Sequence, residues 1–536
     1  MTSRYRLSLL SLLTTLGLAA LSLMGLVALL SHPAPLDAND LAPTPTLTAE
    51  DFVLQAGIAC QISGDAGLPP CHADFVADSI PPSQFGVESE VECRSGLASF
   101  YPCRNIDLVA LLPLSTFESG QLNDIWGWTD PETGAEIVII GAELGTVFVD
   151  ISNPSEPIFL GQLPNTSTAR RSFWKDVKTY QNYAYVVADF AGQFGMQVFD
   201  LTKLRGEGTA PQTFSADFVY DQFGSAHNIM INADTGFAYA VGVSSGQEIC
   251  NMGMHVVDLN SNPLEPTFAG CVDEDGYVHD TQCVVYFGPD ALYQGREICF
   301  NFNEDDLVIV DVTEKDSPVQ LSKVTYVGAR YTHQGWLTPD QSYLLLDDES
   351  DERADFINTT TYLWDVTDLT APQQIGLHRA STRASDHNQY ERWGYTFQAN
   401  YQAGLRILDL ARIDEGELTE VAYFDTFPTG DASNYNGAWS SYPYFESGIV
   451  AVSGIEQGLF LLRPTSLSLQ RFDVNEMSEV KAFPGSVVTH SIELLSLGEV
   501  DTYTVDIETG VWTTTLVSDL TISGSQFDRL PILVQV

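Results

Sequence analysis

The stretch Leu307-Val308-Ile309-Val310-Asp311 decides the fold, because variants of it recur along the chain. Each variant is a short apolar run that ends in Asp, except for the last, which ends in Arg. Successive terminal residues are 50, 58, 53, 54, 44 and 54 positions apart. A period of about 40–50 residues, with several short strands per unit, is typical of β-propeller blades. The terminal residues are Asp150, Asp200, Asp258, Asp311, Asp365, Asp409 and Arg463.

A polar pair precedes each variant and opens an apolar stretch, at intervals of 52, 52, 52, 54, 54 and 48 residues. Two landmarks with the same period predict an all-β, seven-bladed propeller over residues 106–465. Four strand-like segments per unit predict four-stranded blades. In the second unit these segments are Asp176–Tyr180, Tyr183–Asp189, Met196–Asp200 and Gln212–Phe218. The pairs are Asn123-Asp124, Lys175-Asp176, His227-Asn228, His279-Asp280, His333-Gln334, His387-Asn388 and Tyr435-Asn436.

Both flanks of the repeat region carry strand patterns of their own. The last unit lacks a fourth strand after Arg463, and Ile106–Leu114 resembles one, so we expect this segment to close the ring and remove an open sheet edge. After residue 466 the alternation is that of a sandwich. We therefore expect residues 466–536 to form an Ig-like β module that is truncated, because its strand pattern runs up to Val536.

The N-terminus predicts export. Arg4 and Arg6 precede an uncharged apolar run from Leu7 to Leu30. Residues 1–31 are therefore either a cleaved signal peptide or a retained membrane anchor, since the run is long enough to span a bilayer. Residues 32–105 read as a Pro/Thr-rich stalk followed by a Cys-containing cap. We expect an extracellular or cell-surface protein, with membrane contact only through an uncleaved N-terminal segment.

Charge restricts the partners. The chain has 24 Lys and Arg against 71 Asp and Glu, a formal net charge of −47. Nucleic acid is excluded as a partner, because binding phosphates requires Lys and Arg. A surface ligand, either protein or glycan, is the partner class that an exported acidic propeller favours.

The eight cysteines predict disulfides, because their number is even and the chain is exported. No Cys-x-x-Cys pair occurs, which argues against a zinc ribbon or a thioredoxin-type site. We expect pairing between cysteines that are close in sequence: Cys60–Cys71, Cys93–Cys103, Cys250–Cys271 and Cys283–Cys299.

Several long motifs, in order along the chain, resemble the choice-of-anchor B family of bacterial surface proteins and its LVIVD repeat. The resemblance covers residues 90–465 and implies an exported propeller whose members carry varied C-terminal anchors. It implies no reaction. The clearest motifs are Tyr277-Val278-His279-Asp280-Thr281-Gln282-Cys283, Tyr331-Thr332-His333-Gln334-Gly335-Trp336-Leu337-Thr338 and Asn400-Tyr401-Gln402-Ala403-Gly404-Leu405-Arg406.

Four histidines occupy equivalent places in consecutive units: His227, His279, His333 and His387. If each opens an innermost strand, the four side chains and the neighbouring Asp280 gather at one mouth of the central channel. Imidazole and carboxylate groups there could bind a transition metal or a ligand. The alternative is structural, with each polar residue capping its strand and bonding to a neighbouring blade.

Other motifs carry weaker predictions. Asp273 and Asp275 resemble the start of a calcium loop, although the Glu that closes an EF-hand loop is absent. Residues 242–246 fit Gly-x-Ser-x-Gly but lie between two strands, so they predict a hairpin loop and no nucleophile elbow. Tryptophans either stack on sugars at a channel mouth or fill the space between blades: Trp126, Trp128, Trp174, Trp336, Trp393 and Trp439.

Three functions follow from the sequence. The first is a non-catalytic binding or adhesion protein, since no catalytic motif occurs. The second is a metal-dependent, hydrolase-like enzyme that uses the His-bearing channel mouth. The third is a calcium-stabilised structural component of the cell envelope. The cofactor under the last two readings is a transition metal or calcium.

Overall fold

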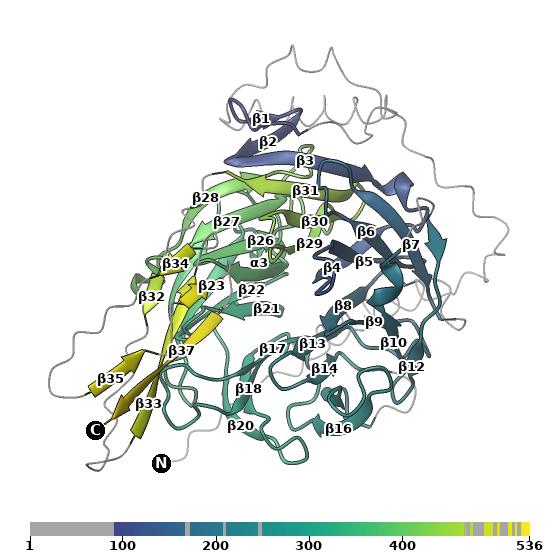
Figure 1. Ribbon diagram of the computed structural model, residues 1–536. Helices are drawn as coiled ribbons and strands as arrows, with labels where there is room; N and C mark the ends of the chain where they lie inside the picture. The colour runs from purple at the N-terminus through teal and green to yellow at the C-terminus, as the bar shows by residue number, and fades with distance from the viewer. Residues whose placement is uncertain are drawn as a thin grey trace, which may run out of the picture. The chain divides into compact units, whose positions relative to one another are not determined.

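A computed structural model of the chain describes residues 90–166, 172–206, 211–244, 249–465 and 467, with the backbone of six further strands. Residues 90–465 form seven mainly antiparallel sheets around a common axis (Figure 1). The protein is therefore an all-β, seven-bladed propeller with four-stranded blades, as predicted. The predictions for residues 1–89, including the signal or anchor, the stalk and Cys60–Cys71, lie outside the described residues.

Each blade is a meander whose first strand lies nearest the axis. The innermost strands contact one another in a continuous ring. They are β4 (Leu122–Thr129), β8 (Lys175–Tyr180), β13 (Asn228–Asn232), β17 (Asp280–Val285), β21 (Thr332–Leu337), β25 (Asn388–Arg392) and β29 (Ala438–Tyr442). The second strands are β5 (Glu136–Ala142), β9 (Tyr183–Ala188), β14 (Phe237–Val241), β18 (Glu297–Phe302), β22 (Tyr343–Asp348), β26 (Tyr395–Ala399) and β30 (Val450–Gly454).

The two outer strands complete each blade. The third strands are β6 (Gly145–Asp150), β10 (Met196–Asp200), β15 (Met254–Asp258), β19 (Leu307–Asp311), β23 (Thr360–Asp365), β27 (Leu405–Asp409) and β31 (Gly458–Pro464). The fourth are β7 (Ile158–Pro164), β12 (Phe218–Tyr220), β16 (Thr267–Val272), β20 (Val319–Val324), β24 (Gln373–Arg379), β28 (Thr419–Phe424) and β3 (Ile106–Pro113). Short helices are η3 (Leu114–Thr116), η4 (Leu201–Leu204), α3 (Asp351–Asp355) and η5 (Ile413–Glu415).

The meander gives the axis two distinct ends. Four antiparallel strands return the chain to the side from which the blade began, so all innermost strands run in the same direction. We call the end at which the innermost strands begin the leading end, and the end at which they finish the trailing end.

The ring is closed by a strand from the far N-terminal side of the repeats. β3 pairs antiparallel with β31, from Ile106 opposite Pro464 to Pro113 opposite Gly458. This confirms the predicted closure, which leaves blade 7 with four strands although only three come from the last repeat. The first residues of the propeller thus depend on its last residues for their hydrogen bonds.

The fourth strand predicted for the second unit was wrong in its bounds. The outermost strand of blade 2 is β12, which lies at the end of the predicted segment. Residues Gln212–Thr213 form β11 and pair in parallel with β7 of blade 1. Gly161 permits this pairing, because a side chain there would meet the Gln212 backbone at 2.0 Å.

Residues that precede the propeller extend blade 6 outward. β2 (Tyr101–Arg104) pairs with β28, and β1 (Leu97–Ala98) pairs with β2. Val91 forms an antiparallel bridge with Leu108 of β3, so this segment also contacts blade 7. The described part of the predicted Cys-containing cap therefore extends the propeller sheets by strand pairing.

Three of the four predicted disulfides lie within the described residues, and all three are present. The Cys283–Cys299 bond joins directly paired residues of β17 and β18. No described cysteine is free. The three bonds are Cys93–Cys103, Cys250–Cys271 and Cys283–Cys299.

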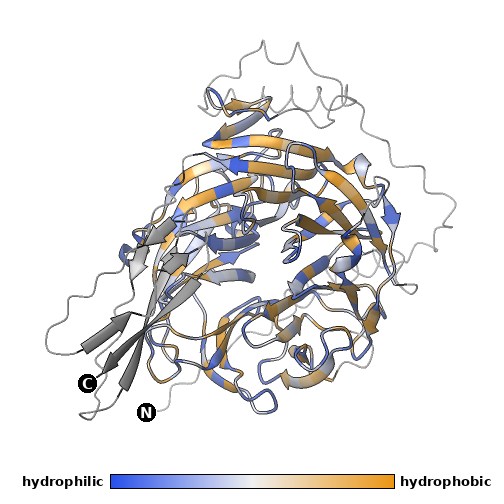
Figure 2. Cartoon of the chain, in the orientation of Figure 1, coloured by the Kyte–Doolittle hydropathy of each residue, from blue (hydrophilic) through white to orange (hydrophobic). Residues whose placement is uncertain are grey.

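The LVIVD strand is apolar throughout because both of its faces are buried. Leu307 and Ile309 pack in one hydrophobic cluster with residues of blade 5, whereas Val308 and Val310 pack in another with residues of blade 3. Alternate residues of a strand point to opposite faces. Full burial of such a side chain stabilises the fold by roughly 1.5–3 kcal/mol. Figure 2 shows hydrophobic residues along the blade strands around the ring.

The Asp at the end of each repeat stabilises the turn that follows, as predicted. Asp311 Oδ1 accepts hydrogen bonds from the backbone N–H and the hydroxyl of Thr313, at 3.0 and 2.6 Å. In each case the carboxylate accepts from the backbone N–H two residues later, which is an Asx turn. The other five examples are Asp150, Asp200, Asp258, Asp365 and Asp409.

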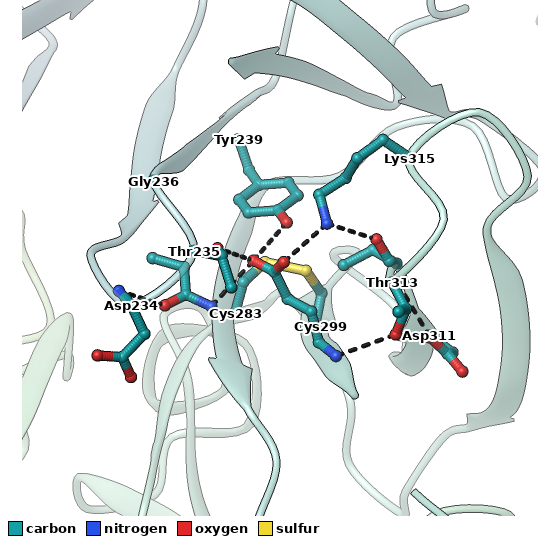
Figure 3. A network of polar contacts seen from close by, with 12 residues as sticks. Asp234, Thr235, Gly236, Tyr239, Cys283, Cys299, Asp311, Thr313 and Lys315 are labelled. Atoms are coloured by element: carbon teal, nitrogen blue, oxygen red, sulfur yellow. Dashed lines mark hydrogen bonds and ion pairs between the residues drawn. A yellow bond between two sulfur atoms is a disulfide. The ribbon is translucent and has the colours of Figure 1, made fainter. Parts of the chain in front are cut away.

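Buried polar groups also join neighbouring blades (Figure 3). Glu297 in blade 4 accepts hydrogen bonds from Asn232, Thr235 and Tyr239 of blade 3, at 2.9, 2.7 and 2.6 Å. Its second oxygen pairs with Lys315 Nζ at 2.7 Å. Because both oxygens of Glu297 have polar partners, its carboxylate can remain buried.

The C-terminal region contains strands near the predicted positions. One sheet has the order β32-β33-β37-β35 and a second contains β34 and β36. The Ig-like assignment for this region stays a prediction. The strands are β32 (Phe472–Val474), β33 (Val487–Ser496), β34 (Asp501–Tyr503), β35 (Thr513–Leu516), β36 (Leu520–Ile522) and β37 (Phe527–Gln535).

Candidate functional site

The four repeat histidines lie side by side at the leading end of the axis. His227, His279 and His387 directly precede innermost strands, and His333 is the second residue of β21. Neighbouring imidazole centroids, taken in chain order, are 4.3, 4.6 and 4.5 Å apart. The repeat therefore places the four rings in one continuous row.

Each imidazole is oriented by a hydrogen bond at Nδ1. His333 Nδ1 lies 3.1 Å from the carbonyl oxygen of His387, and His387 Nδ1 lies 2.6 Å from that of Trp439. Since a carbonyl can only accept, both rings carry their proton on Nδ1 and leave the Nε2 lone pair free. His227 Nδ1 lies 2.9 Å from Asp189 Oδ2.

His279 is oriented by two tyrosine hydroxyls, which can donate or accept a hydrogen bond, and not by a backbone carbonyl. Its Nδ1 lies 3.0 Å from the Tyr331 hydroxyl and 3.2 Å from the Tyr277 hydroxyl. Its Nε2 is buried and has no hydrogen-bond partner among the described residues. An imidazole locked at Nδ1 with a free Nε2 has the arrangement of a metal-binding histidine.

One carboxylate joins this row. Potential ligand atoms of His333, Glu349 and His387 all lie within 4.8 Å of one another. Glu349 follows β22 in the segment that leads into α3, and its Oε1 lies 3.7 Å from His387 Nε2. The Tyr401 hydroxyl donates to the same oxygen at 2.5 Å. Glu349 lies in an acidic run at residues 347–352, and no sequence pattern associates it with the histidines.

Burial sets the protonation of these groups. Desolvation lowers the pKa of His387 to about 3 and holds the pKa values of His279 and His333 well below the usual range. These imidazoles are therefore neutral, as metal ligands must be. Desolvation raises the pKa of Glu349 to about 7, although 16% of its side chain is exposed. A bound cation would favour its carboxylate form.

Asp280 belongs to a different group of buried charged residues, which we call the axial ion cluster. Its members are Asp124, Asp176, Lys178 and Asp280. Lys178 Nζ lies 2.5 Å from Asp176 Oδ1 and 3.4 Å from Asp124 Oδ2. Burial raises the pKa of Asp280 to about 7, and nearby Asp176 adds to this effect. Despite its own burial, Lys178 has a raised pKa because Asp176 and Asp124 stabilise its charge. The cluster thus contains its own cation.

A second group of buried acids, the α3 acid cluster, consists of Asp347, Asp351, Glu352 and Asp386. All four residues are fully buried. No lysine or arginine among the described residues forms an ion pair with any of these four acids, and Asp347 and Asp386 lie next to each other. Desolvation raises the pKa of Asp351 to about 7 and that of Glu352 to about 10.

The predicted calcium residues Asp273 and Asp275 border a surface cavity of about 460 Å³. Asp275 is already engaged, because its two oxygens accept from Lys323 at 2.5 Å and from Asn303 at 2.6 Å. Lys323 also pairs with Asp306 at 3.0 Å. Calcium binding at Asp273 and Asp275 stays a prediction.

The six tryptophans differ in their burial and in their neighbours. Trp128 and Trp393 are buried. Trp439 lies against His387, with ring centroids 4.6 Å apart. Trp126 and Trp336 line a pocket of about 350 Å³. Trp174 is 38% exposed.

Comparison with known proteins identifies the repeat and gives no activity. The LVIVD-repeat family model matches residues 142–163. No curated protein matches the chain. The described residues contain no helix long and apolar enough to cross a membrane.

Solved structures resemble the chain distantly. A protein from Lactobacillus plantarum has 13% identity and a TM-score of 0.40, over 62% of this chain and 88% of that one. A functionally unknown protein from Desulfotomaculum acetoxidans has 11% identity and a TM-score of 0.40, over 58% and 87%. Kuenenia stuttgartiensis hydrazine synthase has 11% identity and a TM-score of 0.42, over 64% and 95%.

Proposed function

We propose that this propeller binds a divalent transition metal at its leading end, through His333, His387 and Glu349. The observation that carries the proposal is the convergence of these three ligand atoms within 4.8 Å. Backbone carbonyls fix both imidazoles with Nε2 free. Two imidazoles and one carboxylate suit zinc and other first-row divalent ions. His279 lies next in the row and could supply a further nitrogen.

The reaction class that this site favours is metal-dependent hydrolysis. Three protein ligands leave a coordination position for water or substrate, as in catalytic zinc sites. A metal bound there would act as a Lewis acid and lower the pKa of water. Tyr401 donates to Glu349 and would orient that carboxylate toward the ion. The buried, neutral imidazoles would need no proton loss before binding.

Elemental analysis tests the proposal. Purified native protein should contain about one equivalent of zinc, manganese, iron or copper per chain. The His333→Ala/His387→Ala variant should lose it, and Glu349→Gln should weaken metal binding by about tenfold or more. His378→Ala, in the outermost strand of blade 5, is the matched control and should retain the metal. Metal-free native protein that takes up none of these ions would overturn the proposal.

A hydrolase screen then separates an enzyme from a binding protein. Chromogenic esters, phosphoesters and glycosides are suitable probes, assayed before and after chelation. Activity that chelation removes and added metal restores supports the hydrolase. A metal-loaded protein inactive on the whole panel would instead favour a binding role.

A non-catalytic surface-binding function is the second candidate, because exposed aromatic side chains adjoin the leading end. Phe173, Trp174 and Phe190 are 47%, 38% and 81% exposed. Trp174 contacts both phenylalanines, with ring centroids 6.3 and 5.6 Å away. Phe190 follows Asp189, the carboxylate that holds His227. Contiguous exposed aromatics favour binding to another surface.

Export and surface attachment also belong to this proposal. The N-terminal pattern and the choice-of-anchor B resemblance support an extracellular or cell-surface location. Three disulfides within the described residues are compatible with an oxidising compartment. Accessibility of the protein on intact cells to an added protease would test this location.

A further inference from the structure

We propose that a pocket at the trailing end of the axis binds a neutral saccharide unit. This inference is independent of the metal site, which lies at the other end. The pocket has a volume of about 350 Å³, within the range of small-ligand sites. Its walls come from different blades, so the closed ring is needed to assemble it. The residues used below are Trp126, Lys178, Thr179, Trp336, Glu391 and Tyr444.

The position of the pocket follows from the strand directions. Lys178 and Glu391 are the fourth residues of β8 and β25, and Trp336 is the fifth residue of β21. Tyr444 follows the end of β29. These positions lie past the middle of the innermost strands, whereas the histidines lie at their starts.

The apolar walls are indole and phenol rings held by one central tyrosine. The Tyr390 centroid lies 5.6 Å from Trp126 and 5.0 Å from Trp336, with both pairs close to edge-to-face. Tyr444 lies 6.1 Å from Trp126. Trp126 and Trp336 keep part of their surface exposed, unlike Tyr390, which is buried. Partly open indole rings offer a surface for the C–H face of a pyranose ring.

Hydrogen-bonding groups lie at the edges of these walls. Among the hydrogen bonds of the described residues, none involves the indole N–H of Trp126 or Trp336, so both remain available as donors. Glu391 Oε1 accepts from the backbone of Gly394 at 2.7 Å, which leaves its second oxygen available. Thr179 also lines the pocket, and its hydroxyl, which donates to the carbonyl of Gly127 at 3.3 Å, can still accept a hydrogen bond. Donors and acceptors around an aromatic wall match the hydroxyl groups of a sugar.

Charge favours a neutral ligand over a cation or an anion. Lys178 Nζ lies 4.6 Å from the Trp126 centroid, so the protein's own ammonium already occupies a cation–π position. Its charge is balanced by Asp176 at 2.5 Å. Burial also raises the pKa of Glu391 to about 8. An organic cation would be repelled by Lys178, and an anion would find no unpaired positive group in the lining, because Lys178 is the only lining cation and is already paired with Asp176.

Saturation-transfer NMR and calorimetry on the full chain test this site. The probes are glucose, galactose, mannose, xylose and their N-acetylated forms, together with tetramethylammonium and phenol. We expect at least one sugar to bind, and Trp336→Ala to weaken that binding by about tenfold or more. Phe356→Ala, which removes an aromatic side chain that is 78% exposed and lies outside the pocket, should leave the affinity unchanged. Trp336→Phe should retain part of the affinity and guards against misfolding.

The outcomes are distinguishable from failure of the metal site. Trp336→Ala should keep the same metal content as the native protein, and His333→Ala/His387→Ala should keep its sugar affinity. Binding of tetramethylammonium or phenol with no sugar binding would overturn the proposal. So would a panel in which no probe binds, or sugar binding that Trp336→Ala does not change.

Discussion

The axial ion cluster and the α3 acid cluster bury carboxylates in opposite ways. In the axial ion cluster, Asp176 and Asp124 surround Lys178, and the positive charge is supplied by the chain. In the α3 acid cluster, no described lysine or arginine forms an ion pair with Asp347 or Asp386. Buried carboxylates without a cation must hold protons or attract an ion from solution. The first arrangement is structural, whereas the second makes the protein sensitive to pH and to cations.

Removal of Lys178 should have the largest effect. Lys178→Met leaves Asp176 buried without its partner, and loss of one member of a buried ion pair costs about 3–5 kcal/mol. The free energy of unfolding from urea denaturation would measure this loss. Lys203→Met is the control, because Lys203 pairs with Asp217 at the surface and such pairs contribute about 1 kcal/mol or less. If the two variants lost the same free energy of unfolding, Lys178 would contribute no more than a surface ion pair.

Stability of the metal-free protein should fall as pH rises from 6.5 to 8. Carboxyl groups with raised pKa values hold protons in the folded state that the unfolded state has already lost, so the slope is negative. Histidines with lowered pKa values act only below about 6.5, and Lys175, whose pKa burial lowers to about 7, opposes the trend with one proton. The groups involved are Asp280, Glu349, Asp351, Glu352, Glu391 and Asp425.

Thermal denaturation at both pH values, in the presence of a chelator, measures this slope. We expect the melting temperature to fall by roughly 5 °C. Calcium or zinc should recover more of the loss at pH 8 than at pH 6.5, because cations compete with protons for the acids. A melting temperature that rises between these pH values would contradict the prediction.

A matched pair of Asp→Asn variants gives the finest comparison. Asp176→Asn removes the charge opposite Lys178 and should destabilise the protein by about 1–3 kcal/mol. Asp386→Asn removes an acid that lacks a cation, so metal-free protein at pH 8 should be unchanged or slightly more stable. Urea denaturation at pH 8 measures both. If Asp386→Asn were as destabilising as Asp176→Asn, the α3 acid cluster would have a partner that the contrast leaves out.

The fold could be predicted because each repeat carries the same short pattern of apolar and polar residues. The uninterrupted apolar residues of the LVIVD strand predict that both of its faces are buried. The closing strand Ile106–Pro113 resembles the fourth strands of other blades in sequence. The parallel pairing of Gln212–Thr213 with blade 1 could not be predicted, since it depends on a close approach at Gly161. Such contacts between blades leave no periodic signal in the sequence.

Only the histidines of the candidate metal site could be predicted from the sequence. Equivalent repeat positions identify His333 and His387, because the same place in each blade faces the same end of the axis. Glu349 lies in a non-repeating segment, so no alignment of blades could bring it to them. The acidic run around it, residues 347–352, contains only oxygen ligands, which by themselves indicate calcium and not a site shared with histidines. Likewise, Trp126 and Trp336 are widely separated in sequence and share a wall only after the ring closes.

The closure of blade 7 has a mechanical consequence. Ile106 pairs with Pro464, and Thr465 donates its backbone N–H to the carbonyl of Asn105 at 2.9 Å. The chain therefore enters and leaves the propeller at the same corner. A force that pulls the flanking segments apart would load the β3–β31 hydrogen bonds one after another, like a zipper, instead of all together. Under tension, the short β2–β28 pairing on the outside of blade 6 and then the β3–β31 pairing of blade 7 would be loaded before the remaining strands of the ring.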